Sequence, residues 1–349
     1  MLTKTIRYVE AVPAREAAGV VAEVYRQAKA EMGLLPEAVT MFSADPRLLA
    51  ATWAPFREAL LVTGVVPRAT KEAVAATVSQ LNDCPYCVDA HTIMLYGSGG
   101  ASFATALLSG TPDRSQPELA ATADWVRAVS TRPAVAPPAP FAVEAVPEMV
   151  GTFTEFQFLN RAITVLLDGT FLPGSEKAQS VARKVAGRVV ARRIRSTKAP
   201  GASVGLPADL PLPADLSWAA PSPHVAAAFG WLAATTDAAA ARALPPAARA
   251  VVEQSLGGWD GHAPGPSRAW LDERTAELAP ADRPAGRLAL LTALAPFQST
   301  AGDVAAYRAD RSADEDLLGL VAWAAFTAAR RIGGWAVPAG RDDAAVSSP

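Results

Sequence analysis

Apolar residues recur at helical spacing along most of this chain, and that periodicity most constrains what it can fold into. In residues 16–33, EAAGVVAEVYRQAKAEMG, Val20 and Val24 belong to one apolar stripe, and Gly33 is suited to end a helix. Residues 155–167, EFQFLNRAITVLL, form a tract that is apolar enough to be buried. Half of the residues are hydrophobic, helix formers dominate, and alternating β-branched runs are scarce. We therefore expect an all-α protein.

The length of the chain and one proline-rich stretch predict two domains. A chain of 349 residues exceeds what one hydrophobic core usually holds. Residues 199–223 are rich in proline and cannot continue a helix, so we expect domains at 1–198 and 199–349. The basic tract before this stretch, residues 175–198, has two interpretations: a solvated helix face or a docking surface for an acidic partner.

The second half resembles a shortened copy of the first. The segment from Pro67 to His91 can be laid over Arg283 to Tyr307 without a gap if one residue slips at the start, and Arg161 later falls over Arg330. Chance similarity between alanine-rich helices is the alternative. If the overlay holds, the second half keeps the fold but not thiol chemistry. Thr300, Asp303 and Tyr307 then stand where the first half has Cys84, Cys87 and His91, and Leu288 stands where it has Glu72.

Charge and hydropathy limit the cellular locations and the classes of partner that we expect for this chain. The net charge is −2, from 32 basic and 34 acidic residues, so no global field favours nucleic acid. The N-terminal sequence lacks the apolar core of a signal peptide, and no apolar run reaches the ~18 to 20 residues of a membrane span. We therefore expect a cytoplasmic protein that binds neither nucleic acid nor membrane. Thiols are normally reduced there, so a close CxxC pair indicates catalysis or metal binding rather than a structural disulfide.

The segment LNDCPYCVDAH, residues 81–91, holds both cysteines and one of the three histidines. Pro85 is favoured at a first helical position, which places Cys84 at the N-cap and Cys87 in the first turn. The positive end of the helix dipole lowers the pKa of both thiols. His91 lies one turn after Cys87 on the same face and can take the thiol proton. After peroxide oxidises one thiolate, the other cysteine can condense with the sulfenic acid to give a disulfide.

Glu72 is a further candidate for this site. It lies twelve residues before Cys84, and one straight helix would separate the two by about 18 Å. A bend at Asn82-Asp83 could return the second helix against the first and bring Glu72 to His91, where a carboxylate would orient the ring. The alternative is that Glu72 is a helix residue facing solvent.

The pattern E-x11-C-P-Y-C-x3-H, at Glu72, Cys84, Cys87 and His91, resembles the active-site signature of the alkylhydroperoxidase D-like proteins. These belong to the carboxymuconolactone decarboxylase superfamily. The segments VSQLNDCPYCVDAHT and FQFLNRAI are similar to its peroxidase-related branch. The resemblance covers residues 15–170 well and the second half faintly. It implies a helical homo-oligomer, a trimer or a dimer, with the CxxC at the start of a buried helix.

The resemblance also implies an activity and a role for each residue. The protein would be a thiol-dependent peroxidase without a cofactor, in which Cys87 attacks a hydroperoxide, Cys84 resolves, and Glu72 and His91 relay protons. A dithiol protein, either lipoyl-bearing or thioredoxin-like, would reduce it. The helix dipole alone favours Cys84 as the more acidic thiol, but a dedicated base, His91, favours Cys87.

One departure from the family pattern affects the expected rate. The best-known peroxidases of the family carry a second histidine just before the attacking cysteine, and here Tyr86 stands in that place. Tyrosine can donate a hydrogen bond but cannot act as a base at neutral pH. We therefore expect weaker peroxide turnover, with general disulfide exchange as the alternative role.

Other kinds of site and function stay open. A metal could be bound by Cys84, Cys87, His91 and Glu72. Structural zinc sites, however, usually draw a second Cys/His pair from elsewhere in the chain. His224 and His262 do not form such a pair, and we expect them to be surface or loop residues. A thioredoxin-like fold would need a strand before the CxxC, but the residues there predict a helix, so we set that fold aside. The glycine-rich residues 96–102 lack GxGxxG spacing and are expected to form a loop rather than a nucleotide site. The fold could also serve lactone decarboxylation or act as a binding scaffold, with two cysteines that are only structural.

Overall fold

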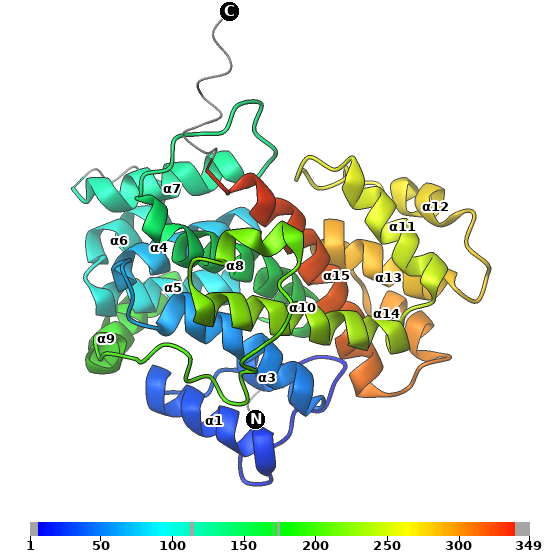
Figure 1. The fold of residues 1–349 in the computed structure, drawn as a ribbon, viewed down its shortest axis with the longest axis horizontal. Coiled ribbons are helices and arrows are strands. Elements are labelled where there is room, and N and C mark those ends of the chain that lie inside the picture. The colour runs from blue at the N-terminus through cyan, green and yellow to red at the C-terminus, as the bar shows by residue number, and fades with distance from the viewer. Residues whose placement is uncertain (1–5, 112–114, 170, 173–174, 339–349) are drawn as a thin grey trace, which may run out of the picture.

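The computed structural model describes residues 6–111, 115–169, 171–172 and 175–338 (Figure 1). Over these ranges the chain is helical and forms no strand; residues Ile6 and Leu167 make one isolated bridge. The all-α prediction is therefore confirmed. None of the described helices is long and apolar enough to cross a membrane.

The first half contains nine α-helices and a π-helical turn, η1, among the described residues. They are α1 (Gly19–Met32), α2 (Glu37–Thr40), α3 (Pro46–Pro55), η1 (Phe56–Leu61), α4 (Arg68–Leu81), α5 (Pro85–Ser98), α6 (Ala101–Ser109), α7 (Pro117–Val129), α8 (Val146–Leu166) and α9 (Glu176–Ile194). The glycine-rich segment is not the loop that was expected. It comprises the end of α5, a left-handed C-cap at Gly99 and the start of α6, because glycine can end one helix and let the next begin at once.

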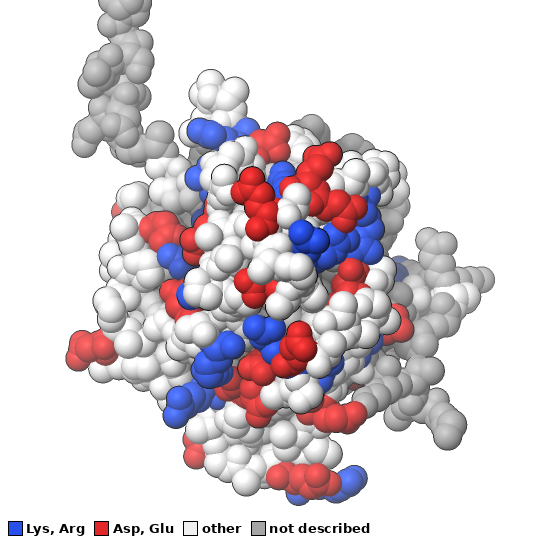
Figure 2. Space-filling model, turned by 90° about the vertical axis from the view of Figure 1, so that its right-hand side faces the viewer, with Lys and Arg blue, Asp and Glu red and all other residues white. Residues whose placement is uncertain are grey.

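The described part of the second half contains six further α-helices. They are α10 (Pro223–Ala243), α11 (Pro246–Gly257), α12 (Ala269–Thr275), α13 (Arg283–Leu294), α14 (Ala301–Arg308) and α15 (Asp314–Trp335). Short 3-10 turns lie at Val143–Ala145, Ala214–Ala219 and Pro296–Gln298. On the face shown in Figure 2, acidic and basic side chains are interspersed, so neither sign of charge dominates it.

Helix α8 lies at the centre of the molecule, and every residue in it except Thr164 is buried. It packs against α4 and η1 of its own half and against α15 of the other, while α10 packs on both α3 and α15 (Figure 1). One hydrophobic core continues through both halves. The domain boundary near residue 200 stays a prediction.

The helix starts agree with the proposed internal repeat. Helix α14 begins at Ala301 with Thr300 as its N-cap, just as α5 begins at Pro85 with Cys84 as its N-cap. Thr300 and Asp303 form a capping box where the first half has cysteines. Leu288 and Tyr307 are both buried, and the Tyr307 hydroxyl donates to the carbonyl of Ala243 at 3.0 Å. The second half thus uses these positions for capping and packing.

The basic tract forms α9, which packs against α5. Arg183 points inward and its Nε donates to Asp89 of α5 at 2.9 Å. The side chains of Lys184, Arg188 and Arg192 are exposed. A solvated helix face therefore describes most of this tract, and Arg183 is the residue that anchors it.

Candidate active site

The cysteine pair lies where α4 turns back into α5. Helix α4 ends at Leu81, and Asp83 adopts a left-handed conformation with φ of 51°, which reverses the chain direction. The backbone N–H of Cys84 donates to the carbonyl of Ser79 at 3.0 Å, which holds the start of α5 against the end of α4. The bend expected at Asn82-Asp83 is present.

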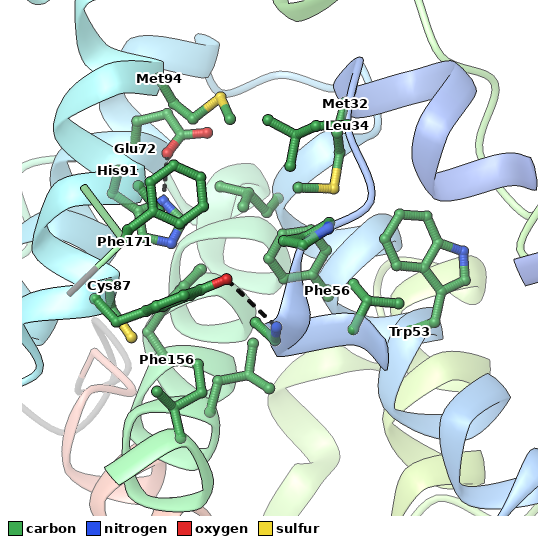
Figure 3. Close-up of a pocket in the computed structure, with 18 of the residues that line it drawn as sticks. Met32, Leu34, Trp53, Phe56, Glu72, Cys87, His91, Met94, Phe156 and Phe171 are labelled. Carbon is green, nitrogen blue, oxygen red and sulfur yellow. Dashed lines mark hydrogen bonds and ion pairs between the residues drawn. The ribbon is translucent and has the colours of Figure 1, made fainter. Parts of the chain in front are cut away.

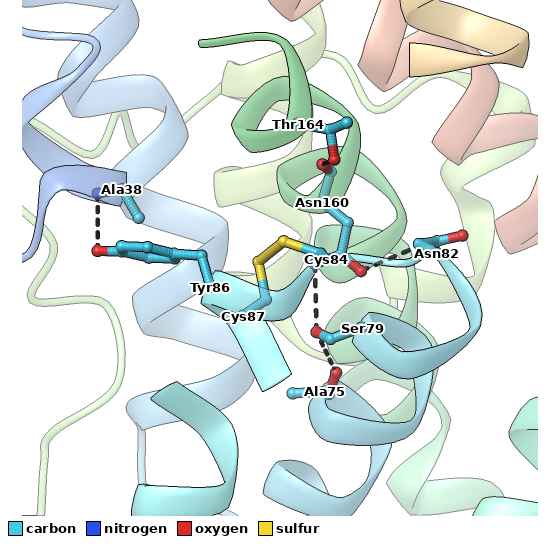
Figure 4. Close-up of a disulfide and its surroundings, with 9 residues drawn as sticks. All are labelled: Ala38, Ala75, Ser79, Asn82, Cys84, Tyr86, Cys87, Asn160 and Thr164. Carbon is cyan, nitrogen blue, oxygen red and sulfur yellow. Dashed lines mark hydrogen bonds between the residues drawn. A yellow bond between two sulfur atoms is a disulfide. The ribbon is translucent and has the colours of Figure 1, made fainter. Parts of the chain in front are cut away.

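Cys84 and Cys87 are joined in a disulfide, with 5.4 Å between their Cα atoms. Both residues are buried. Figure 4 shows Cys84 on the side of Asn160 and Ser79, whereas Cys87 lies toward Tyr86. The two sulfur atoms therefore have different surroundings, although they belong to one turn of helix.

The turn between the helices brings Glu72 to His91. Glu72 Oε2 lies 2.7 Å from His91 Nδ1, and its other oxygen accepts a hydrogen bond from Arg68 Nε, also at 2.7 Å (Figure 3). The His91 ring packs edge-on against Phe156 with 4.3 Å between centroids. Glu72 is fully buried, so the alternative of a solvent-facing residue is wrong.

The charge state of Glu72 follows from its neighbours. Burial alone raises the pKa of its carboxyl, but Arg68 and His91 outweigh this, and the pKa lies below its ordinary value. Glu72 is then a carboxylate at neutral pH and can only accept hydrogen bonds, so Nδ1 of His91 carries the proton that it accepts. In a neutral ring with this tautomer, the other nitrogen, Nε2, has a lone pair that can take a proton from a thiol.

Tyr86 lies beside the disulfide and is held there by a hydrogen bond and a ring contact (Figure 4). Its hydroxyl donates to Glu37 Oε2 at 3.1 Å, and its ring packs edge-on against Phe171. Burial raises the pKa of Tyr86 far above its usual value, and the nearby Glu37 carboxylate raises it further. The phenol therefore stays protonated and cannot act as a base, as expected from its residue type.

A narrow cavity of about 60 Å³ opens beside this site. Cys87, His91, Glu72 and Arg68 line it, and Cys84 is not among its lining residues. The rest of its wall is almost entirely apolar (Figure 3). A molecule in the cavity would therefore meet Cys87 and His91 together. The lining side chains that complete the wall include Met32, Leu34, Trp53, Phe56, Met94, Phe156 and Phe171.

The remaining histidines lie outside this site. His224 is half-buried in the first turn of α10 beside Ser222, and His262 is exposed and paired with Asp260 at 3.2 Å. In the part of the chain that the structure describes, no group of three or more His, Cys, Asp or Glu side chains is placed to hold a metal ion.

One residue of the site went unnoticed in the sequence. Arg68 lies one turn before Glu72 on α4 and pairs with it, and this i,i+4 spacing of opposite charges is a visible helix signal. The packing of Phe156 on His91 left no such signal, because the two residues are 65 positions apart.

Comparison with known proteins agrees with the resemblance in the motif. The model of the carboxymuconolactone decarboxylase family matches residues 47–102, which include α4 and α5. A protein of Mycobacterium tuberculosis (strain ATCC 25618 / H37Rv) named alkyl hydroperoxide reductase Rv2159c is 48% identical over 333 residues. This alignment covers 95% of each chain, so the similarity extends through the second half as well.

Proposed function

This chain belongs to the carboxymuconolactone decarboxylase family, and from that premise we propose that it reduces organic hydroperoxides with the Cys84–Cys87 pair. The observation that supports this most is the cavity in which Cys87 faces an apolar wall beside His91, whose ring is held by the Glu72 carboxylate. The alkyl part of a hydroperoxide suits such a wall. The relative from Mycobacterium tuberculosis is named for the same activity.

The proposed reaction starts from the reduced pair. His91 Nε2 takes the thiol proton, and the Cys87 thiolate attacks the terminal peroxide oxygen. The O–O bond breaks, the alkoxide leaves as an alcohol after gaining the proton, and Cys87 becomes a sulfenic acid. Cys84 then gives up its thiol proton and its thiolate attacks the Cys87 sulfur; the hydroxyl group of the sulfenic acid leaves with that proton as water, and the disulfide forms. Two electrons have passed from the dithiol to the peroxide.

Cys87 is the proposed attacking residue because it lines the cavity and lies one turn before His91 on the same face of α5. Cys84 lies on the other side of the disulfide, near Asn160 (Figure 4). Cys84 at the N-cap is within reach to resolve. A dithiol protein, lipoyl-bearing or thioredoxin-like, then reopens the disulfide by thiol exchange. We further infer that the protein works in the cytoplasm as a homo-oligomer.

Disulfide exchange with a protein substrate is the second candidate function. The cavity is small, and Tyr86 stands where the best-known peroxidases of this family carry a second histidine. Both features would slow peroxide turnover without preventing thiol exchange.

Consumption of cumene hydroperoxide supported by dithiothreitol tests the proposal. We expect Cys87→Ser to abolish it and Cys84→Ser to reduce it, because a sulfenic acid at Cys87 can still be reduced directly by the added thiol. One equivalent of peroxide should convert both free thiols of the parent to the disulfide.

Three outcomes would contradict the proposed peroxidase activity. Equal activity in the parent and both variants would remove the cysteines from the reaction. A parent that exchanges disulfides but leaves the peroxide unchanged would favour the second candidate. Stoichiometric metal that is lost with either cysteine would favour a metal site.

A further inference from the structure

Arg161 of α8 is a buried cation that has no carboxylate partner among the described residues. Its Nε donates to the carbonyl of Ala293 at 3.0 Å, and its Nη1 donates to the carbonyl and side-chain oxygens of Gln157 at 2.6 and 2.8 Å. Its Nη2 has no hydrogen-bond partner in the described ranges, yet it is not one of the atoms sealed from solvent. Burial lowers the pKa of Arg161 to about 10, so the guanidinium keeps its charge at neutral pH.

The second half offers a direct comparison. Arg330, the residue that the repeat equates with Arg161, makes two hydrogen bonds to Asp215, from Nε at 2.8 Å and from Nη2 at 2.5 Å. It is also close to an aromatic ring, that of Phe326 at 5.8 Å, as Arg161 is close to Trp259 at the same distance. Asp215 thus accepts from both Nε and Nη2 of the half-buried Arg330, whereas the more deeply buried Arg161 meets only carbonyl and amide oxygens. A buried cation is costly without an anion, which makes the open Nη2 of Arg161 notable.

Arg161 lines a pocket of about 280 Å³ between the two halves. The first half contributes residues 81–83 and 160–161 to its lining, and the second half contributes Trp259, Gly261, Ala263, Leu294, Pro296 and Phe297. The Trp259 ring is held in place because its Nε1 donates to the carbonyl of His262 at 2.7 Å. Two large apolar side chains of the same pocket, Leu81 and Phe297, are 46% and 59% exposed, which is unusual for side chains of this size.

We propose that this pocket binds a small molecule that carries a single carboxylate on an aromatic or other apolar group. The carboxylate would accept from Arg161 Nη2, as Asp215 does from Arg330, and the apolar part would cover Trp259 and Phe297. A monoanion fits better than a phosphate dianion, because one guanidinium supplies the positive charge and Asp83 also lines the pocket. Neither cysteine lines the pocket, so it is separate from the peroxide cavity.

Isothermal titration calorimetry of the full chain with benzoate tests this proposal. We expect one benzoate per chain, with binding at least tenfold weaker for benzyl alcohol, which keeps the ring without the charge, and for inorganic phosphate, which lacks the ring. Arg161→Gln should weaken benzoate binding at least tenfold, because a hydrogen bond to a charged group is lost. Arg330→Gln is the matched control and should leave the affinity for benzoate unchanged.

A second variant covers the case in which Arg161→Gln does not fold. Phe297→Ala changes an exposed side chain, and we expect it to weaken benzoate binding several-fold with an unchanged melting temperature. The proposal is overturned if benzoate and benzyl alcohol bind equally, if phosphate binds as tightly as benzoate, or if no benzoate binding is detected. Benzoate binding that survives both Arg161→Gln and Phe297→Ala would place the ligand elsewhere and also overturn it.

Discussion

His91 and Glu72 form a buried pair in which each residue needs the other. The buried carboxylate of Glu72 is not stabilised by water; instead, Arg68 and His91 stabilise its charge through hydrogen bonds of 2.7 Å. Since these contacts lower the pKa of Glu72 in the folded protein, they contribute stability above the pKa of the unfolded state. That contribution is lost as the pH falls through the lower pKa of the folded state. The same contacts fix which nitrogen of His91 can act as a base.

Glu72→Gln should lower peroxide turnover by about 100-fold, because a neutral amide can no longer fix the His91 tautomer or stabilise a protonated ring. The value of kcat/KM for cumene hydroperoxide measures this effect. The pH dependence of Cys87 alkylation in the reduced protein should move to higher pH in the same variant. Asp124→Asn alters an exposed carboxylate on α7 and serves as the control. An unchanged alkylation profile in Glu72→Gln would argue against any coupling between Glu72 and the thiol.

Glu155 is a second buried carboxyl group on α8, but it lacks the contacts that Glu72 has. Neither of its oxygens has a hydrogen-bond partner in the described structure, and burial raises its pKa well above the usual value. At a pH between the two pKa values, the folded state therefore holds a proton that the unfolded state has released. Because the folded pKa is the higher of the two, this group costs stability increasingly as the pH rises above the unfolded pKa.

Glu155→Gln should therefore raise the free energy of unfolding by about 1 to 3 kcal/mol at pH 8 and by much less at pH 5. Urea denaturation at both pH values measures the difference. Glu144→Gln, at an exposed position just before α8, should show no such dependence on pH. A stability gain that is the same at both pH values would mean that Glu155 is already ionised in the folded protein.

At the scale of helices, local signals could be predicted and long-range contacts could not. Proline at the first helical position identified the start of α5 because that preference depends only on neighbouring residues. The approach of Glu72 to His91 was a hypothesis, since a bend permits it but only the packing of α4 against α5 places the carboxylate. Nothing in the sequence marks Arg161 as lacking an anion, because Arg330 has the same local pattern and its partner, Asp215, is remote.

The contact between α5 and α9 depends on glycine. A Cβ atom at Gly187 of α9 would lie 2.6 Å from the Cβ atom of Tyr96 and 2.8 Å from the carbonyl oxygen of Ile93, both on α5. Two of the atoms that this Cβ would meet belong to the backbone of α5, so the clash could be relieved only if one of the two helices moved as a whole. Close approach here lets α9 cover the helix that carries the cysteine pair.

Gly187→Ala should lower the free energy of unfolding by about 1 to 3 kcal/mol, in spite of the better helix propensity of alanine, because it overpacks this contact. Thermal or urea denaturation measures the loss. Gly257→Ala is the matched control, since a Cβ atom there meets no other atom within 4 Å at the end of α11, and we expect no destabilisation. Equal effects of the two substitutions would show that α9 is free to shift away from α5.

At the scale of the whole molecule, hydrogen bonds tie the start of the connection between the halves to the first half. Arg57 Nη2 donates to the carbonyl of Ala199 at 3.1 Å, and the Gln27 side chain donates to the carbonyl of Ala202 at 2.7 Å. The Ser203 hydroxyl donates to the buried carboxylate of Glu58 at 2.5 Å. The proline-rich stretch that predicted a domain boundary therefore begins as a segment anchored to the first half.

These contacts, and the packing of α15 on α8, lead us to expect that both halves unfold together. Urea denaturation followed by tryptophan fluorescence and by circular dichroism should give one coincident transition. Residues 1–198 produced alone should aggregate or stay unfolded, because removal of α15 exposes one face of α8, whose residues are buried almost throughout. Mixing this fragment with residues 199–349 during refolding should restore peroxide consumption if the halves recognise each other through α8 and α15. A soluble, active fragment 1–198 would instead support two independent domains that meet near residue 200.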